Sequence, residues 1–246
     1  MSGVLPDEAT LEVMWHDLEN GSYAEDLALW RELAATHGTP VLDVGAGTGR
    51  VTLDLARRGH AVVALDRSAN FLAVLRERAG RLPVGAVEAD ARAFSLGRRF
   101  PLIIAPMQTI QLLGGPEPRG RFLACARAHL EPGGVVAVAL AEALDAFDAD
   151  HDQPPLPDLR EVNRVVFSSR PVAVTDEGDR IAIHRIRETV DLHGNRTARG
   201  DVVHLDRVSA AALAEEAAAH GLEAEEARFI AQTDDYVGST VVMLRG

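Results

Sequence analysis

The chain is predicted to fold as an α/β protein in which a doubly wound, mostly parallel sheet carries helices on both faces. The first observation is an apolar run at 41–44 that is followed at once by Gly45, Gly47 and Gly49. The second is a helical pattern that runs from Val51 to Gly59. Strand, glycine turn and helix in this order form the first unit of such a sheet. The alternation continues with further apolar runs at 60–65, 81–87, 100–105 and 135–140.

Size and charge limit the classes of function. The chain has 246 residues and is 47% hydrophobic, which suits one large α/β domain or a domain with an insertion. Its formal net charge is −12 and no basic run occurs, so a nucleic acid is a poor candidate partner. The same acidic balance would attract a substrate that carries an amine.

Missing residue types exclude further chemistry. The single cysteine, Cys125, excludes an internal disulfide and a cysteine-rich metal site, and no metal is expected. The lack of lysine excludes lysine Schiff-base chemistry and a Walker A phosphate loop. Residues 1–17 have no apolar signal core and no run reaches membrane-spanning length. We therefore expect a soluble cytoplasmic protein without membrane contact.

The glycine spacing indicates which ligand the turn would hold. Gly45, Gly47 and Gly49 give G-x-G-x-G, whereas a dinucleotide fold uses G-x-G-x-x-G. Glycines are used where the backbone needs a positive φ or must lie against a ligand, so a tight turn without a ligand is the alternative. We expect the unpaired amides at the start of the following helix to face the ligand.

The run from Val41 to Gly49, Val-Leu-Asp-Val-Gly-Ala-Gly-Thr-Gly, resembles the first motif of class I S-adenosylmethionine-dependent methyltransferases of the small-molecule type. The resemblance is strong over 41–140 and implies S-adenosyl-L-methionine as the cofactor, with the turn against its methionine and ribose parts. It also implies a seven-stranded sheet in the order 3-2-1-4-5-7-6, parallel except for an antiparallel last strand, with an antiparallel β insertion after strand 5.

By the same resemblance we expect a single methyltransferase domain over 1–246. Its four parts are an N-terminal helical lid at 1–38, a cofactor-binding core at 39–140, a lid with the β insertion at 141–206, and the final helix and strands at 207–246.

Acidic residues follow two of the predicted strands. Asp66 ends the second strand, 17 residues after Gly49, near the distance at which an acid bonds ribose hydroxyls. The alternative is that Asp66 or Ser68 caps the helix at 69–79, and both roles can hold at once. Asp90 follows the third strand; by resemblance it accepts from the adenine amino group while the Ala91 amide faces a ring nitrogen, and a loop-capping aspartate is the alternative. The expected cofactor-binding residues are Asp43, Gly45, Ala46, Gly47, Gly49, Asp66, Arg67, Asp90, Ala91, Ala105 and Pro106.

The expected substrate pocket is formed by the segment after the fourth strand and by a residue of the N-terminal lid. The carboxyl edge beside the glycine turn is the topological switch point, where ligands bind. By resemblance the loop at 106–109 lines the methyl-transfer site, and it is not the Asn-Pro-Pro-aromatic loop of base-modifying methyltransferases. Tyr23 is a candidate lid residue by resemblance, with a surface tyrosine as the alternative. The candidate pocket residues are Tyr23, Met107, Gln108 and Gln111, and no general base is identified.

Beyond residue 140 the pattern weakens. An acidic stretch lacks the central glycine and closing glutamate of an EF-hand loop, so a solvated loop or a lid is favoured over a metal site. This stretch contains Asp145, Asp148, Asp150, His151 and Asp152. Residues 165–206 predict a β-rich insertion with strands at 165–167, 172–174, 181–192 and 202–205. By resemblance, such an insertion covers the substrate or builds a homodimer. A helix at 208–220 and strands at 222–231 and 237–244 complete the expected fold.

The expected function is methyl transfer from S-adenosyl-L-methionine to a small molecule, with an amine nitrogen as the favoured acceptor. The sulfonium is already electrophilic, so the enzyme mainly aligns the nucleophile and excludes water. A nicotinamide-dependent oxidoreductase is one alternative, against which the glycine spacing and the lack of a Tyr-x-x-x-Lys pair count. A non-catalytic adenosyl-binding protein is another, and a structural protein would not need acids at both strand ends.

Overall fold

The computed structural model describes residues 6–142, 144, 146–149, 155–233 and 236–246. The chain forms two compact units. The core unit consists of Tyr23–Ala143 and Val208–Gly246, and the insertion unit of Met1–Ser22 and Leu144–Arg207. The predicted N-terminal lid at 1–38 is therefore divided between the two units. The single-domain organisation stays a prediction.

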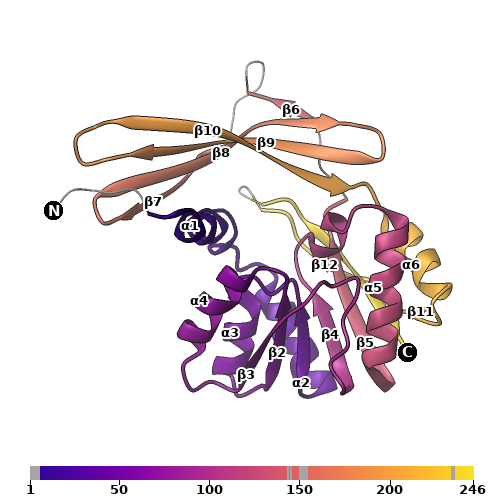
Figure 1. Cartoon of the computed structure of the whole chain (residues 1–246). Helices are drawn as coiled ribbons and strands as arrows, with labels where there is room; N and C mark the ends of the chain where they lie inside the picture. The colour runs from indigo at the N-terminus through magenta and orange to yellow at the C-terminus, as the bar shows by residue number, and fades with distance from the viewer. Residues whose placement is uncertain (1–5, 143, 145, 150–154, 234–235) are drawn as a thin grey trace. The chain divides into compact units, whose positions relative to one another are not determined.

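The core unit is built on a mixed sheet whose strand order confirms the predicted topology (Figure 1). The order β3-β2-β1-β4-β5-β13-β11 corresponds to 3-2-1-4-5-7-6, and β13 pairs antiparallel with β5. The sixth predicted strand is split into β11 and β12, which both pair with β13, so the sheet has eight strands. The strands are β1 (Val41–Val44), β2 (Val62–Asp66), β3 (Val84–Glu88), β4 (Phe100–Ala105), β5 (Leu130–Leu140), β11 (Glu223–Ala224), β12 (Arg228–Ile230) and β13 (Ser239–Arg245).

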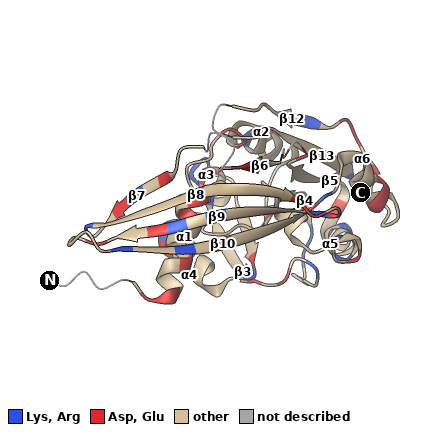
Figure 2. Cartoon of the chain, turned by 90° about the horizontal axis from the view of Figure 1, so that it is seen from above, with Lys and Arg blue, Asp and Glu red and all other residues tan. Residues whose placement is uncertain are grey.

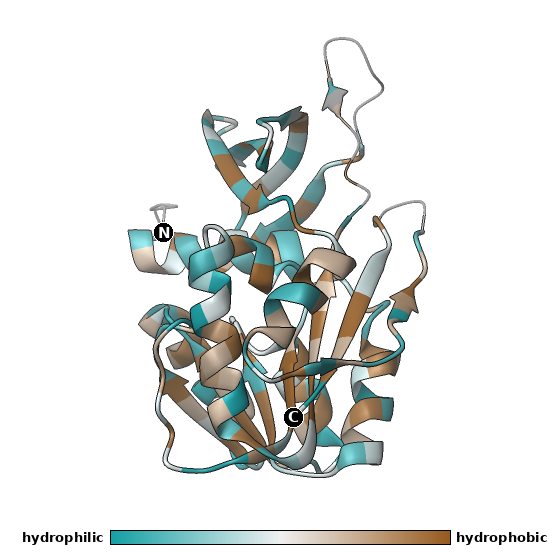
Figure 3. Cartoon of the chain, turned by 90° about the vertical axis from the view of Figure 1, so that its right-hand side faces the viewer, coloured by the Kyte–Doolittle hydropathy of each residue, from teal (hydrophilic) through white to brown (hydrophobic). Residues whose placement is uncertain are grey.

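Helices cover both faces of this sheet, as predicted. On one face α2 and α3 bury Trp30 and Leu55 against Ile104 of β4. On the other face α5 and α6 pack, with Phe122 of α5 buried beside Ile103 of the same strand. Because β1, β4 and β5 are covered on both sides, their buried stretches are apolar without alternation, apart from Asp43 in β1. Figure 3 shows hydrophobic residues in brown along strands of the core sheet. The helices are α2 (Leu27–His37), α3 (Arg50–Arg57), α4 (Ala69–Ala79), the 3-10 helix η1 (Thr109–Leu112), α5 (Pro116–His129) and α6 (Ala210–Ala218).

The insertion unit is a five-stranded antiparallel sheet with one helix, and Figure 2 marks the charged residues along its strands. The two predicted strands at 165–167 and 172–174 are one continuous strand, whose register shifts between Pro171 and Ala173. Helix α1 packs on this sheet, where the rings of Trp15 and Phe167 meet edge to face at 5.4 Å. The elements are α1 (Glu8–Asn20), β6 (Phe147–Asp148), β7 (Asp158–Val162), β8 (Val165–Asp176), β9 (Arg180–Val190) and β10 (Arg196–Asp206).

The two ends of the insertion are joined within the core unit. Glu142 lies just before the chain leaves the core, and its Oε1 accepts a hydrogen bond from the amide of Ala210 at 2.9 Å. Ala210 is the first residue of α6, which begins soon after the chain returns. Exit and return points are therefore neighbours. Among the described residues no helix is long and apolar enough to cross a membrane.

Candidate functional site

The predicted cofactor residues gather at one edge of the core sheet. The glycine turn follows β1, Asp66 ends β2, Asp90 follows β3 and Pro106 follows β4. These four strands are neighbours and run in parallel, so their carboxyl ends lie at the same edge (Figure 1). The chain order reverses direction between β1 and β4, which makes this edge the switch point of the sheet.

The glycine turn serves packing as well as backbone conformation. Gly45, Gly47 and Gly49 have φ values of 73°, 56° and 96°, which favour glycine. A Cβ on Gly45 would stand 2.5 Å from the Thr109 side chain, and one on Gly49 would stand 2.2 Å from Leu75. Part of the glycine pattern is therefore explained by close packing without a ligand.

Several amides of this turn already donate within the protein. The Gly45 and Ala46 amides donate to the carbonyl of Leu65 at 2.8 and 3.1 Å, and the Gly49 amide donates to Ala46 at 2.9 Å. The Gly47 amide donates to Asp66 Oδ2 at 2.8 Å. These amides belong to the turn and its last glycine, whereas the expectation concerns the amides at the start of α3, from Arg50 onward, and stays a prediction.

Asp66 links the end of β2 to the glycine turn. Besides the bond from Gly47, its Oδ1 accepts from the Ser68 amide at 2.9 Å. Ser68, and not Asp66, caps α4, because its hydroxyl accepts from the Phe71 amide. Each carboxylate oxygen keeps further acceptor capacity. The ribose contact predicted for Asp66 is compatible with these bonds and stays a prediction.

Asp43 carries a buried carboxylate oxygen without a partner. The residue is 1% exposed, its Oδ2 accepts from the Thr52 hydroxyl at 2.6 Å, and its Oδ1 has no hydrogen bond among the described residues. Burial raises the pKa of Asp43 to about 6, against the lowering effect of the Thr52 bond. A buried acceptor without a donor is costly, so this position favours a ligand that supplies a donor or a positive charge.

Asp90 is engaged by Arg92 at the end of β3. The Arg92 amide donates to Asp90 Oδ1 at 2.8 Å, which is the loop-closing arrangement, and the Arg92 guanidinium binds both carboxylate oxygens. These hydrogen bonds lower the pKa of Asp90 to about 2. Asp90 therefore caps its own loop in this structure, as the alternative predicts. Its contact with adenine stays a prediction.

The loop after β4 has an unusual backbone. Met107 has a φ of 54°, a region that residues other than glycine rarely occupy and that tends to mark functional or constrained positions. The Thr109 hydroxyl donates to the carbonyl of Pro106 at 2.9 Å and closes the loop. Ala105 and Pro106 are buried, while Met107 and Gln108 are half-buried at the edge of the sheet.

Gln111 is tied to the backbone at the end of β5. The side chain is 1% exposed; its Nε2 donates to the carbonyl of Ala141 at 3.1 Å, and its Oε1 accepts from the Ala141 amide at 2.9 Å. This reciprocal pair fixes η1 to the neighbouring strand. The predicted contact of Gln111 with the substrate would have to coexist with both bonds.

Tyr23 is enclosed by Tyr236 and Arg50, which are not among the predicted site residues. Its ring lies 4.9 Å from the ring of Tyr236, and the Arg50 guanidinium lies 5.1 Å from its centre. Arg50 also donates to the carbonyl of Tyr23 at 3.0 Å and pairs with Asp26 at 2.5 and 2.7 Å. Desolvation, followed by the charge of Asp26, raises the pKa of Tyr23. The surface-tyrosine alternative is wrong, because Tyr23 is 7% exposed.

Two signals in the sequence could have revealed this cluster. The chain has only two tyrosines, and they are the two in contact. Arg50 stands directly after the third glycine, so its side chain begins at the turn itself. Asp26, which also accepts from the Trp30 indole at 2.8 Å, carries no such signal.

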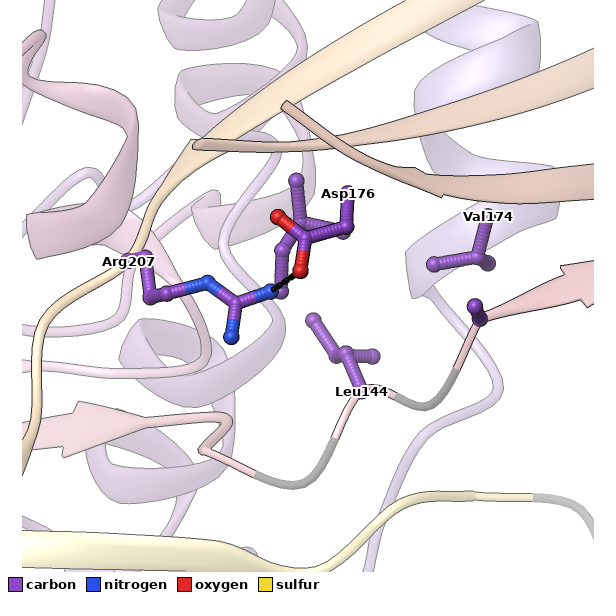
Figure 4. Close-up of a pocket in the computed structure, with 6 residues that line it drawn as sticks. Leu144, Val174, Asp176 and Arg207 are labelled. Carbon is purple, nitrogen blue, oxygen red and sulfur yellow. Dashed lines mark ion pairs between the residues drawn. The ribbon is translucent and has the colours of Figure 1, made fainter. Parts of the chain in front are cut away.

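A cavity of about 200 Å³ lies in the insertion unit (Figure 4). At its wall Arg207 pairs with Asp176 at 2.8 Å, so the two charges neutralise each other. No predicted site residue lines it, and it supports no part of the cofactor site. Its lining residues are Leu144, Ala146, Val174, Asp176, Ile181 and Arg207.

The structure describes only a small part of the acidic stretch for which a metal site is one of the alternatives. Asp148 lies in β6, whereas Asp145, Asp150, His151 and Asp152 lie outside the described residues. Among the residues that are described, no group of three or more histidine, cysteine or acidic side chains could hold a metal ion.

Comparison with known proteins gives a sequence match over the region that carries the predicted cofactor residues. Residues 41–134 match the family model of a methyltransferase domain. The cypemycin N-terminal methyltransferase of Streptomyces sp. is 34% identical over 143 residues, which is 58% of this chain and 56% of that protein. The dTDP-3-amino-3,4,6-trideoxy-alpha-D-glucopyranose N,N-dimethyltransferase of Streptomyces venezuelae is 31% identical over 116 residues, 47% of this chain and 48% of that protein. The chain therefore aligns with about half the length of these curated relatives.

The solved structures extend the likeness of fold to the full chain. The S-adenosylmethionine-bound CalS10, an amino pentose methyltransferase from Micromonospora echinaspora, superposes with a TM-score of 0.71 over 100% of both chains at 21% identity. At that identity the superposition establishes the fold, and the family match at 41–134 establishes the sequence relationship. Residues 41–134 thus resemble a methyltransferase domain in sequence, and the chain as a whole has the fold of the solved S-adenosylmethionine-bound methyltransferase.

Proposed function

We propose that the protein transfers a methyl group from S-adenosyl-L-methionine to an amine nitrogen of a small molecule. The observation that carries the proposal is the unpartnered, buried oxygen of Asp43 beside the glycine turn. The cofactor's methionine part bears an ammonium group, which supplies both a donor and a positive charge. A carboxylate in that position gains a charge-assisted hydrogen bond that the protein alone does not provide.

The remaining parts of the cofactor have candidate partners along the same edge. Asp66 would accept from the ribose hydroxyls through its remaining acceptor positions, with Arg67 beside it. Asp90 and the Ala91 amide would meet the adenine ring. The turn at 45–49, with Ala46 in it, and the buried pair Ala105 and Pro106 would border the methionine and the sulfur. When bound, the cofactor supplies an electrophilic methyl group on its sulfonium.

An amine acceptor is supported by charge and by the names of the relatives. The net charge of −12 favours the approach of a cationic substrate, which must lose its proton before attack. The two curated relatives described above are named as an N-terminal and an N,N-dimethyl transferase. Orientation alone can lower the barrier by about 7–11 kcal/mol, so a dedicated base is not required. Met107 and Gln108 are the candidates for contact with the acceptor.

Calorimetry with three ligands tests the proposal. We expect S-adenosylmethionine and S-adenosylhomocysteine to bind with micromolar dissociation constants, and a nicotinamide dinucleotide to show no binding. Tight binding of the dinucleotide would instead support an oxidoreductase. Binding of the first ligand without methyl transfer to any member of a panel of small amines would support a non-catalytic adenosyl-binding protein.

We also propose a homodimer formed through the insertion unit. Its strands and the turn after β9 expose large apolar side chains, which favours a covered face in solution. Light scattering after size exclusion would show twice the chain mass, and a monomer at micromolar concentration would contradict the proposal. Cytoplasmic location stays a prediction. The exposed residues are Leu159, Val166, Leu192 and Val202.

A further inference from the structure

Arg92 holds the carboxylate that the proposed adenine contact needs. Its Nε donates to Asp90 Oδ1 at 2.8 Å and its Nη2 donates to Oδ2 at 2.5 Å. The Arg92 amide adds a third bond, to Oδ1 at 2.8 Å. A two-point guanidinium contact fixes the plane of a carboxylate, which a single-point contact does not do.

These bonds leave little open acceptor capacity on Asp90. Each carboxylate oxygen has two lone pairs, and Oδ1 uses both, one for the Arg92 amide and one for Nε. Oδ2 accepts from Nη2 and shares Nε at a longer 3.1 Å. Because the Nε proton is shared and lies nearer Oδ1, the second lone pair of Oδ2 is the least occupied acceptor position of the carboxylate. Next to it, the Ala91 amide makes no hydrogen bond among the described residues.

One open acceptor beside one open donor is a pattern that distinguishes purines. The edge of adenine offers an amino donor at C6 and an acceptor at N1, which this pair complements. The edge of a 6-oxo purine offers an acceptor at C6 and a donor at N1, so both contacts would be repulsive. A site of this kind rejects the wrong ligand strongly because its polar groups are left unpaired.

We propose that Arg92 is a positioning residue through which this chain selects a 6-amino over a 6-oxo purine in its cofactor. The inference rests on the proposed function, because it assumes that Asp90 and Ala91 meet the purine. Arg92 acts by fixing the plane of the Asp90 carboxylate, which sets the direction of the open lone pair of Oδ2.

The test compares S-adenosylhomocysteine with S-inosylhomocysteine by calorimetry on the full chain at pH 7.5. We expect the wild type to bind the inosyl compound at least about a hundredfold more weakly. Arg92→Gln should weaken the adenosyl compound about tenfold and leave the inosyl compound little changed, so that the ratio falls to about ten. Arg92→Lys keeps the charge but not the fork, and its ratio should lie between the two.

Two further variants separate positioning from general structure. Asp90→Asn can turn its amide N–H toward a 6-oxo group, so its ratio should approach one. Arg58→Gln is the matched control, since Arg58 is an exposed arginine that pairs with Asp54 at the far end of α3, and its ratio should equal that of the wild type. Melting curves identify any variant that does not fold. The ratios measured for the remaining variants then test the role of Arg92.

The outcomes distinguish this inference from the proposed function. If the wild type binds neither compound, the proposed function fails. If it binds both equally, or if Arg92→Gln keeps the full ratio, the cofactor assignment stands but the role of Arg92 is refuted.

Discussion

At the scale of single residues, Asp43 is the side chain whose protonation state matters most for the proposed function. Its folded-state pKa of about 6 lies above the ordinary value of 3.8 because it is buried. The folded protein therefore binds this proton more tightly than the unfolded chain, and the stability contribution of Asp43 decreases as the pH rises through about 4 to 6. The total change is about 3 kcal/mol. A cationic ligand would offset it by favouring the ionised form.

This yields a prediction for cofactor binding. The proposed contact is between the ammonium group of S-adenosylmethionine and the ionised carboxylate of Asp43, so the affinity of the cofactor should be about tenfold lower at pH 5 than at pH 7. Asp43→Asn should bind more weakly and show no such dependence. Thr52→Val removes the hydrogen bond that lowers the pKa of Asp43, so its transition should lie at higher pH. Calorimetric titrations at half-unit steps measure all three; a flat wild-type profile would contradict the assignment.

At the scale of elements, the strands at the ligand edge are held in place by side chains from the loops between them. Gln111 joins η1 to the end of β5 through two hydrogen bonds. Gly45 lies against Thr109, so the glycine turn and the loop after β4 also fit each other. These contacts within the protein hold the loops at the edge in place, and such preorganisation lowers the ordering cost of binding.

Gln111→Leu should therefore destabilise the core unit. It leaves the amide and the carbonyl of Ala141 buried without partners, at a cost of about 2–4 kcal/mol in the free energy of unfolding. Gln108→Leu, three positions earlier, is the matched comparison, because the Gln108 side chain makes no hydrogen bond among the described residues; it should change stability by less than about 0.5 kcal/mol. Urea denaturation gives both values. Equal effects would mean that the reciprocal bonds contribute little.

The boundaries of elements show where sequence patterns are insufficient. The order of the core strands follows from their apolar runs, because a strand buried on both faces leaves a strong local pattern. β8 is predicted as two strands, since Arg170 and Pro171 interrupt its pattern; the structure accommodates the proline at a register shift. β5 begins at Leu130, and not at 135, because Leu130 still pairs with Phe100. Such pairings depend on the partner strand.

In the candidate site, too, some positions follow from local sequence patterns and others depend on distant partners. The placement of Asp66 and Asp90 follows from topology, because parallel strands bring their carboxyl ends to one edge. The contact between Arg50 and Asp26 joins residues 24 positions apart, and the contact between Tyr23 and Tyr236 joins opposite ends of the chain. No local periodicity encodes these partners, so the cluster could only be seen in three dimensions.

At the scale of the whole molecule, the first helix belongs to the insertion unit and is held there by charge. Glu19 of α1 accepts from the Ser169 hydroxyl at 2.7 Å and from Arg187 of β9 at 2.7 and 2.8 Å. Glu19 is largely buried, with a side chain 10% exposed. A buried ion pair of this kind adds little to the free energy of folding compared with an apolar contact, but removing one partner is costly because it leaves the other charge buried and unpaired.

Glu19→Ala should therefore loosen the insertion unit selectively. We expect a local loss of about 2 kcal/mol, because Arg187 and Ser169 lose their common acceptor while Arg187 keeps its pair with Asp201. Hydrogen exchange should quicken at the amides of β8 and β9 and stay unchanged in β1 and β4. Arg196→Ala, which removes an exposed pair with Glu188, should leave both sets of amides unchanged.

The bond between Glu142 and the start of α6 has a consequence for how such proteins diversify. Since the chain departs and re-enters the core at adjacent positions, the sheet imposes no particular length or shape on the segment between them. Such a segment can be lengthened, trimmed or exchanged while the strands beneath keep their register.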